Sequence, residues 1–216
     1  MAHTGGMHVL IVDDHPIVRR GLVQLMLDRP NVSSCGEACS VDGALAECGR
    51  QRPDVIVLDL SLQDESGLEL VRRLRASGDT TPILVLSMYD ETMHAERALR
   101  TGAQGFMMKA SAAEVVADAV DRAARGERVL SPAMHARFDA PGAAAATAID
   151  PVAALTSREL EVLRLIGEGH STAGIADRQC RSVKTIESHR ESIKRKLALR
   201  SATELVRYAT LWREHG

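Results

Sequence analysis

Five short apolar runs alternate with stretches of helical spacing, and this alternation constrains the fold more than any other feature of the chain. The runs are rich in Val, Ile and Leu and have the length of buried strands. They occupy residues 8–12, 32–38, 54–59, 82–87 and 105–109. Between them lie stretches of about 10 to 14 residues with apolar side chains three or four positions apart. Strands that alternate with helices predict an α/β fold with a five-stranded, parallel, doubly wound sheet.

The pattern changes twice after the fifth run. Ser111 and Glu114 have the spacing of a capping box and predict the helix that completes the fifth strand–helix unit. The run PGAAAATAIDP then combines helix-breaking Pro and Gly with small side chains, which predicts an interdomain linker, with an Ala-rich helix inside it as the alternative. The sequence therefore predicts one domain at residues 7–128, a linker at 129–153 and a second domain at 154–216.

The second domain shows helical periodicity throughout. Thr156 with Glu159, and Ser201 with Glu204, have the spacing of capping boxes, and two further serines are candidate N-caps. These signals predict four short helices in a small all-α domain. The further N-cap candidates are Ser171 and Ser182. In the helix after the second of them, the apolar residues predicted to face inward are Val183, Ile186, Ile193 and Leu197.

Charge and cysteine usage restrict the class of protein only modestly. Residues 1–130 carry 14 Lys/Arg against 19 Asp/Glu, whereas residues 156–216 carry 12 against 8, so the second domain is weakly basic. That balance is compatible with nucleic acid but also with an ordinary solvated helical surface. The four cysteines lack CxxC spacing and a neighbouring His cluster, so we expect free thiols and no zinc site. No secretory signal or 18-residue apolar run is present, and we expect a cytoplasmic protein. Residues 1–6 are either a flexible leader or an added, non-native segment.

Polar residues stand where the apolar runs end. Asp13 and Asp14 follow the first run, Asp59 ends the third, Ser87 the fourth and Lys109 the fifth. In an open α/β sheet these carboxyl ends meet at one edge, where ligands bind. Clustered carboxylates repel one another unless a cation neutralises them, and hard oxygen ligands suit Mg²⁺. An ionised aspartate beside an ammonium and a hydroxyl can act as a nucleophile on a phosphoryl group, although each residue alone would more often form a turn.

Residues 7–128 resemble the receiver domain of two-component response regulators. The resemblance implies a flavodoxin-like fold, with Asp59 as phosphoacceptor, Ser87 and Phe106 as switch residues and Lys109 as the lysine that stabilises the phosphoryl group. It also implies magnesium ligation by Asp14 and Asp59 directly, by Asp13 through water and by the carbonyl of Ser61. The turn DDHP has no Gly-rich phosphate loop, which argues against a nucleotide site. Leu62 and Gln63 depart from a Met-Pro pair common in the family, which leaves phosphorylation and hydrolysis rates open.

Residues 155–209 resemble the LuxR-type helix-turn-helix, through motifs such as SVKTIESH, and both domains together resemble the NarL/FixJ class. A recognition helix would enter the major groove of DNA by its amino end. By family position Glu187, Ser188 and Glu191 would read bases, and the residues placed at the DNA backbone are Lys184, Thr185, His189 and Lys194. Glu187 is either an acceptor for a cytosine amino group or a solvated salt-bridge partner. Gly174 departs from the family and would weaken a helix interior by about 1 kcal/mol.

The predicted function is regulation of transcription by phosphorylation. A histidine kinase would phosphorylate Asp59, the region around Ser87 and Phe106 would rearrange, and a homodimer would engage two DNA half-sites. We expect no enzyme activity beyond slow self-dephosphorylation. Two alternatives are a protein-interaction module with a disabled receiver and a metal-dependent phosphohydrolase that uses the same aspartate.

Overall fold

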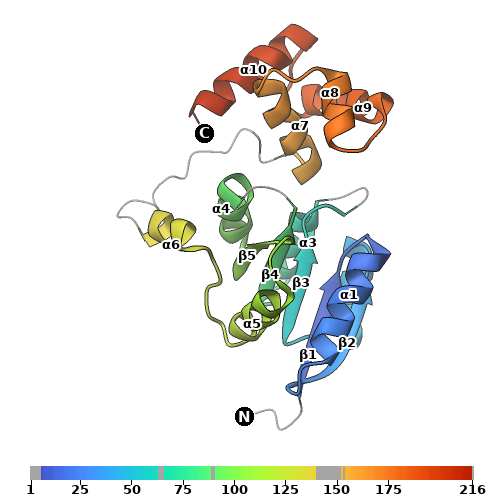
Figure 1. Ribbon diagram of the computed structural model, residues 1–216, viewed down its shortest axis with the longest axis vertical. Helices are drawn as coiled ribbons and strands as arrows, with labels where there is room; N and C mark the ends of the chain where they lie inside the picture. Colours follow the sequence, from blue (N-terminus) through green and yellow to red (C-terminus); the bar gives the residue numbers. More distant parts are fainter. Residues whose placement is uncertain (1–5, 63–65, 89–90, 140–151, 153, 216) are drawn as a thin grey trace. The chain divides into compact units, whose positions relative to one another are not determined.

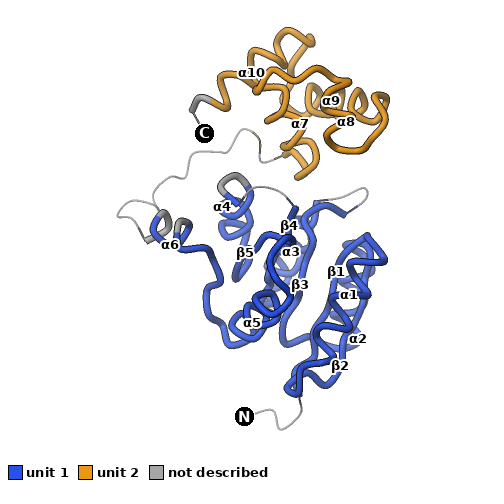
Figure 2. The backbone as a smooth tube through the Cα atoms, in the orientation of Figure 1, with its two compact units in different colours: residues 1–146 blue, residues 147–216 orange. Residues whose placement is uncertain are grey.

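The computed structural model describes residues 6–62, 66–88, 91–139, 152 and 154–215. The chain divides into two compact units, residues 1–146 and residues 147–216 (Figure 2). Among the described residues, no helix has both the length and the apolar character needed to cross a membrane.

The first unit is built on a parallel sheet with strand order β2-β1-β3-β4-β5 (Figure 1). Each strand lies within one residue of a predicted apolar run, so the predicted five-stranded parallel sheet is confirmed. The strands are β1 (Met7–Val12), β2 (Val32–Ala38), β3 (Val55–Asp59), β4 (Ile83–Ser87) and β5 (Gly105–Met108).

Helices cover both faces of this sheet, which explains why the strand sequences are continuously apolar. Successive residues of a strand point to opposite faces. Leu10 of β1 therefore packs in the core beneath α2, α3 and α4, whereas Val9 packs in the core beneath α1 and α5. The helices are α1 (Pro16–Leu27), α2 (Val41–Arg50), α3 (Gly67–Ala76), α4 (Glu91–Thr101) and α5 (Ala113–Ala124).

The predicted capping box at Ser111 and Glu114 is wrong. Helix α5 begins at Ala113, its N-cap is Ala112, and no side chain caps it. Ser111 therefore lies one residue before the N-cap, in a turn in which its N–H donates to the carbonyl of Met108 at 3.1 Å.

The first residues of the predicted linker pack against the first unit. Val129 bridges to Gly105 beside β5, and the N–H of Phe106 donates to the Val129 carbonyl at 2.9 Å. Helix α6 (Pro132–Asp139) follows, and its Met134 is buried in the core beneath α4. The sequence prediction gave more weight to the Ala-rich run than to these apolar side chains. That run itself lies outside the described residues.

The second unit contains the four predicted helices. They are α7 (Ser157–Gly167), α8 (Thr172–Arg178), α9 (Val183–Lys196) and α10 (Ala202–His215). The capping box at Thr156 is confirmed, with Glu159 N–H donating to Thr156 Oγ1 at 3.2 Å and Thr156 N–H donating to Glu159 Oε2 at 2.7 Å. Ser171 and Ser182 are confirmed as the N-caps of α8 and α9.

Three further features of this unit refine the sequence prediction. Ser201 Oγ accepts from Glu204 N–H at 3.1 Å, but the Glu204 carboxylate accepts from Arg200 N–H rather than from Ser201. Gly174 lies in the first turn of α8, where its N–H donates to Ser171 Oγ, so it is not in the helix interior. Val183 was predicted to face inward, but it is 45% exposed at the first position of α9.

The burial of Met134 tests whether α6 belongs to the first unit. We expect Met134→Ala to lower the free energy of unfolding by about 2–5 kcal/mol, as for other buried large-to-small substitutions. Met88 is 70% exposed, so Met88→Ala should change the free energy of unfolding by less than about 0.5 kcal/mol. Urea unfolding of the full chain, followed by circular dichroism, measures both. Equal effects of the two substitutions would show that α6 does not dock on this core.

Candidate functional site

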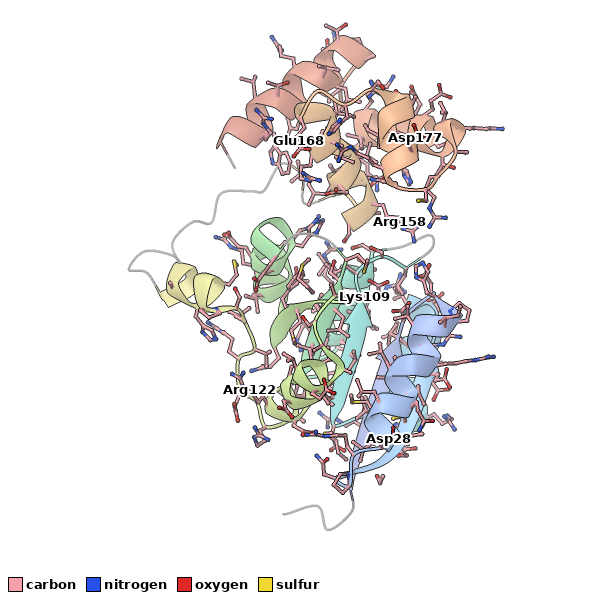
Figure 3. The ribbon with its side chains drawn as sticks, viewed as in Figure 1. Asp28, Lys109, Arg122, Arg158, Glu168 and Asp177 are labelled. Carbon is pink, nitrogen blue, oxygen red and sulfur yellow. The ribbon has the colours of Figure 1, made fainter. Side chains whose placement is uncertain are left out.

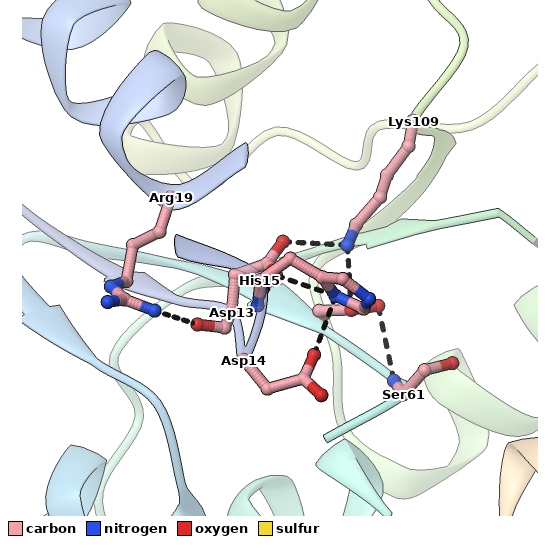
Figure 4. A network of polar contacts seen from close by, with 7 residues as sticks. Asp13, Asp14, His15, Arg19, Ser61 and Lys109 are labelled. Atoms are coloured by element: carbon pink, nitrogen blue, oxygen red, sulfur yellow. Dashed lines mark hydrogen bonds and ion pairs between the residues drawn. The ribbon is translucent and has the colours of Figure 1, made fainter. Parts of the chain in front are cut away.

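The sheet gathers charged residues at the carboxyl ends of its strands. Asp13 directly follows β1, and Asp59 is the last residue of β3. Lys109, labelled in Figure 3, directly follows β5. Lys109 Nζ lies 2.6 Å from Asp13 Oδ2 and 2.7 Å from Asp59 Oδ2. The lysine side chain is 8% exposed and the two carboxylates are 1% and 2% exposed. One buried ammonium group therefore holds two buried carboxylates together (Figure 4).

The Asp59 carboxylate is incompletely compensated for its burial. Burial is the largest effect and raises the pKa of Asp59, and the nearby Asp13 raises it further. Lys109 lowers the pKa of Asp59, and so does the Ser61 N–H, which donates to Asp59 Oδ1 at 3.1 Å. Together they do not outweigh the effect of burial. The pKa of Asp59 is thus raised above its ordinary value of 3.8. A further positive charge at this carboxylate would stabilise its ionised form.

Asp14 and His15 complete the cluster beside Asp13. His15 Nδ1 lies 2.8 Å from Asp14 Oδ1, and the His15 N–H donates to Asp13 Oδ1 at 2.8 Å. One potential ligand atom from each of Asp13, Asp14, His15 and Asp59 lies within 4.8 Å of the other three. His15 was not predicted as a site residue, although its place directly after the acid pair was a signal. Three carboxylates supply the hard oxygen donors that Mg²⁺ prefers, so these residues fit that ion.

The loop that follows Asp59 is held by backbone contacts. Ser61 and Ser66 form an isolated antiparallel bridge, and the Gly67 N–H donates to the Leu60 carbonyl at 3.0 Å. A Cβ atom on Gly67 would lie 2.3 Å from the Asp59 carbonyl oxygen, so only glycine fits there without movement. Leu62 is buried in the core, whereas Gln63 lies outside the described residues. The role of the Ser61 carbonyl as a metal ligand stays a prediction.

Ser87 and Phe106, the predicted switch residues, are both buried. Ser87 ends β4, and its carbonyl accepts from the Lys109 N–H at 2.8 Å, which places the hydroxyl residue and the lysine at neighbouring strand ends. Phe106 is 1% exposed and packs in the core beneath α4. The structure therefore gives Phe106 a packing role, and its movement as a switch stays a prediction.

In the second unit, the predicted DNA-contacting residues differ in exposure. Those on the outward side of α9 are Lys184, Glu187, Ser188 and Glu191, and all four are exposed. Thr185 is partly buried, and its hydroxyl contacts Ser182 Oγ at 2.8 Å as part of the helix cap. Arg195 shares the outward face, four residues after Glu191, and was missed although the helical spacing indicated it.

His189 is partly buried, and the end of α9 is linked to α7 by an ion pair. Burial is the main cause that lowers the pKa of His189 below its ordinary value of 6.5, so its ring is neutral at neutral pH. Lys196 Nζ lies 2.6 Å from the buried Glu159 Oε2, which links α9 to the first turn of α7. Burial alone would raise the pKa of Glu159, but hydrogen bonds from Lys196, Ser192 and Thr156 outweigh it and lower that pKa. These contacts fix the orientation of α9 within the unit.

Comparisons with known proteins give the same division of the chain. Residues 9–121 match the family described as "Response regulator receiver domain", and residues 153–209 match "Bacterial regulatory proteins, luxR family". The oxygen regulatory protein NreC of Staphylococcus carnosus is 34% identical over 209 residues, covering 94% of this chain and 96% of its own length.

Two solved structures are similar. A two-component response regulator of the LuxR family from Aurantimonas sp. SI85-9A1 is 30% identical, with a TM-score of 0.57 over 61% of this chain and 94% of that one. RcsB from Salmonella enterica serovar Typhimurium, bound to promoter P1flhDC in the presence of phosphomimetic BeF₃⁻, is 26% identical. Its TM-score is 0.55 over 95% of this chain and 98% of that one.

The close approach at Gly67 gives a test of the loop after Asp59. We expect Gly67→Ala to lower the free energy of unfolding by about 1–3 kcal/mol, because its methyl group would displace backbone. Gly21 lies in α1, and a Cβ atom there would meet nothing within 4 Å beyond the helix's own backbone. Gly21→Ala should therefore instead raise that free energy by about 0.5–1 kcal/mol. Chemical denaturation measures both, and stabilisation by Gly67→Ala would contradict the contact.

The raised pKa of Asp59 gives a pH-dependent test. A carboxyl group whose pKa is higher in the folded than in the unfolded state stabilises the fold at a pH below the unfolded-state pKa. This contribution is lost as the pH rises through the folded-state pKa. At neutral pH without divalent cations, Asp59→Asn should therefore raise the thermal midpoint, and the gain should narrow as the pH falls. Asp42→Asn, at an exposed carboxylate, should show no such trend. A lower midpoint for Asp59→Asn at neutral pH would mean that pairing with Lys109 outweighs burial.

Proposed function

Because this chain belongs to the two-component response regulators of the NarL/FixJ class, with a receiver domain and a LuxR-type DNA-binding domain, we propose that Asp59 is its phosphoacceptor. The observation that carries the proposal is the buried cluster in which the Asp59 carboxylate lies 2.7 Å from Lys109 Nζ, among two further aspartates. Phosphorylation by a sensor histidine kinase would then control dimerisation and binding to promoter DNA.

Phosphoryl transfer needs an ionised carboxylate, and the site supplies one at the end of β3. An Asp59 oxygen attacks the phosphorus of a phosphohistidine, the new P–O bond forms as the P–N bond breaks, and the imidazole leaves. Asp14, Asp59 and the Ser61 carbonyl would hold a Mg²⁺ ion directly, and Asp13 would act through water. The bound ion would neutralise phosphoryl charge. The positive charge of this ion would favour the ionised form of Asp59 despite the burial of its carboxyl group.

Lys109 and Ser87 would stabilise the product. Lys109 Nζ already contacts Asp59 Oδ2, so it can pair with a phosphoryl oxygen carried by that carboxyl group. The Ser87 carbonyl accepts a hydrogen bond from the Lys109 N–H, and the Ser87 hydroxyl would donate to another phosphoryl oxygen. A new dianionic group at this edge changes the local charge and biases the Ser87 and Phe106 region toward a second arrangement.

The output of this change would be DNA binding by α9. We propose that Glu187, Ser188 and Glu191 face base edges, and that the residues at the DNA backbone are Lys184, Thr185, His189 and Lys194. The neutral ring of His189 suits a hydrogen bond to a phosphate rather than an ion pair. RcsB, a relative, was captured on promoter DNA with a phosphomimetic. We further propose that this regulator binds DNA in the cytoplasm as a homodimer.

Phosphorylation of the purified full chain tests the proposal. Incubation with acetyl phosphate and Mg²⁺ should label wild type on one site, and Asp59→Asn or chelation of the cation should abolish the label. Asp42→Asn, on the same unit, should be labelled normally. The DNA affinity of wild type should rise about 5- to 150-fold on phosphorylation, the usual range of such coupling. Label on Asp59→Asn, or an equal rise in its DNA affinity, would refute the assignment; turnover of phosphate esters would indicate an enzyme instead.

A further inference from the structure

The three predicted base-reading side chains of α9 are not equally available to DNA. Ser188 Oγ donates its hydrogen to the Lys184 carbonyl at 3.0 Å, so that it can only accept further hydrogen bonds. Glu191 Oε1 lies 2.8 Å from Lys194 Nζ, so that its charge is already paired. Glu187 is exposed and forms no ion pair with any residue that the structure describes. Among these three side chains, its carboxylate is therefore the anionic acceptor left open for an external donor.

An unpaired carboxylate on a DNA-facing helix carries an energetic cost. DNA is polyanionic, and its phosphates attract the surrounding Lys and Arg side chains but repel a glutamate. Nearby Lys184 and Arg190, three residues before and after Glu187, reduce this repulsion without removing it. The cost is offset only where a base presents an N–H group to the carboxylate.

The pattern of donors and acceptors in the major groove selects one base. Guanine and thymine present acceptors, which repel a carboxylate. Adenine presents an amino group, but its neighbouring N7 is an acceptor that faces the same side chain. Cytosine presents its N4 amino group without an adjacent acceptor of its own. A single acceptor such as the Glu187 carboxylate matches this pattern.

We propose that Glu187 is a specificity-determining residue that accepts a hydrogen bond from the N4 amino group of one cytosine in each DNA half-site. The inference rests on the proposed function of α9 as the recognition helix, and it specifies the base that this helix selects. Glu191 contributes less selectivity, because Lys194 competes for its oxygens.

Selection of binding sites from random DNA tests this directly. The full chain is used, phosphorylated with acetyl phosphate and Mg²⁺, as wild type, Glu187→Ala and Asp177→Ala. Asp177 is an exposed carboxylate on α8 without a described ion pair, so Asp177→Ala makes the same change in net charge. Wild type and Asp177→Ala should both enrich a cytosine at one position of each half-site, whereas Glu187→Ala should accept other bases there.

A matched change in the DNA measures the coupling between side chain and base. Replacing the selected C·G pair by T·A should weaken wild type and Asp177→Ala by about tenfold or more, and Glu187→Ala by much less. A cytosine preference that survives in Glu187→Ala would overturn this inference and leave DNA recognition by α9 intact. If wild type enriches no sequence at all, the proposed sequence-specific binding fails together with it.

Discussion

The contact of Lys109 with Asp13 and Asp59 is the interaction on which the rest of the receiver unit depends. Strand order β2-β1-β3-β4-β5 places β1 beside β3, so the carboxylates that follow these strands are neighbours. Lys109 follows β5, two strands away from β3, and its long side chain reaches both aspartates at one edge (Figure 4). Burial of three charged groups is costly unless each is compensated, and here one ammonium serves two carboxylates. The edge is therefore prepared for a further cation.

The second unit also holds a buried carboxylate, Glu159, but its pKa is shifted in the opposite direction from that of Asp59. Glu159 also contacts a lysine, Lys196, but it receives additional hydrogen bonds from Ser192 and Thr156, and its pKa is lowered. Asp59 lacks comparable compensation, and its pKa is raised. The contacts of Glu159 fix α7 against α9 and have a structural role. The negative charge of Asp59 is only partly compensated by its neighbours, which is characteristic of a site that acts on a ligand.

Sequence patterns predicted the regular elements well and their exceptions poorly. Strands buried on both faces, and caps such as Thr156 and Ser182, are local signals that a sequence displays directly. The predicted cap at Ser111 was wrong because residue spacing alone does not decide where a helix begins. The exposure of Val183 and the docking of Met134 depend on which other elements cover them, and that information is not local. The spacing of strand ends predicted the acidic edge, but not the place of His15 in it.

The position of a bound cation would show whether the acidic edge of the sheet is a metal site. Crystals of the full chain grown with Mn²⁺ in place of Mg²⁺ would show its position by anomalous scattering. We expect a peak within about 2.0–2.5 Å of carboxylate oxygens of Asp14 and Asp59, near the distances for such ions. A peak elsewhere in the protein, or none at this edge when the ion is in excess, would contradict this expectation.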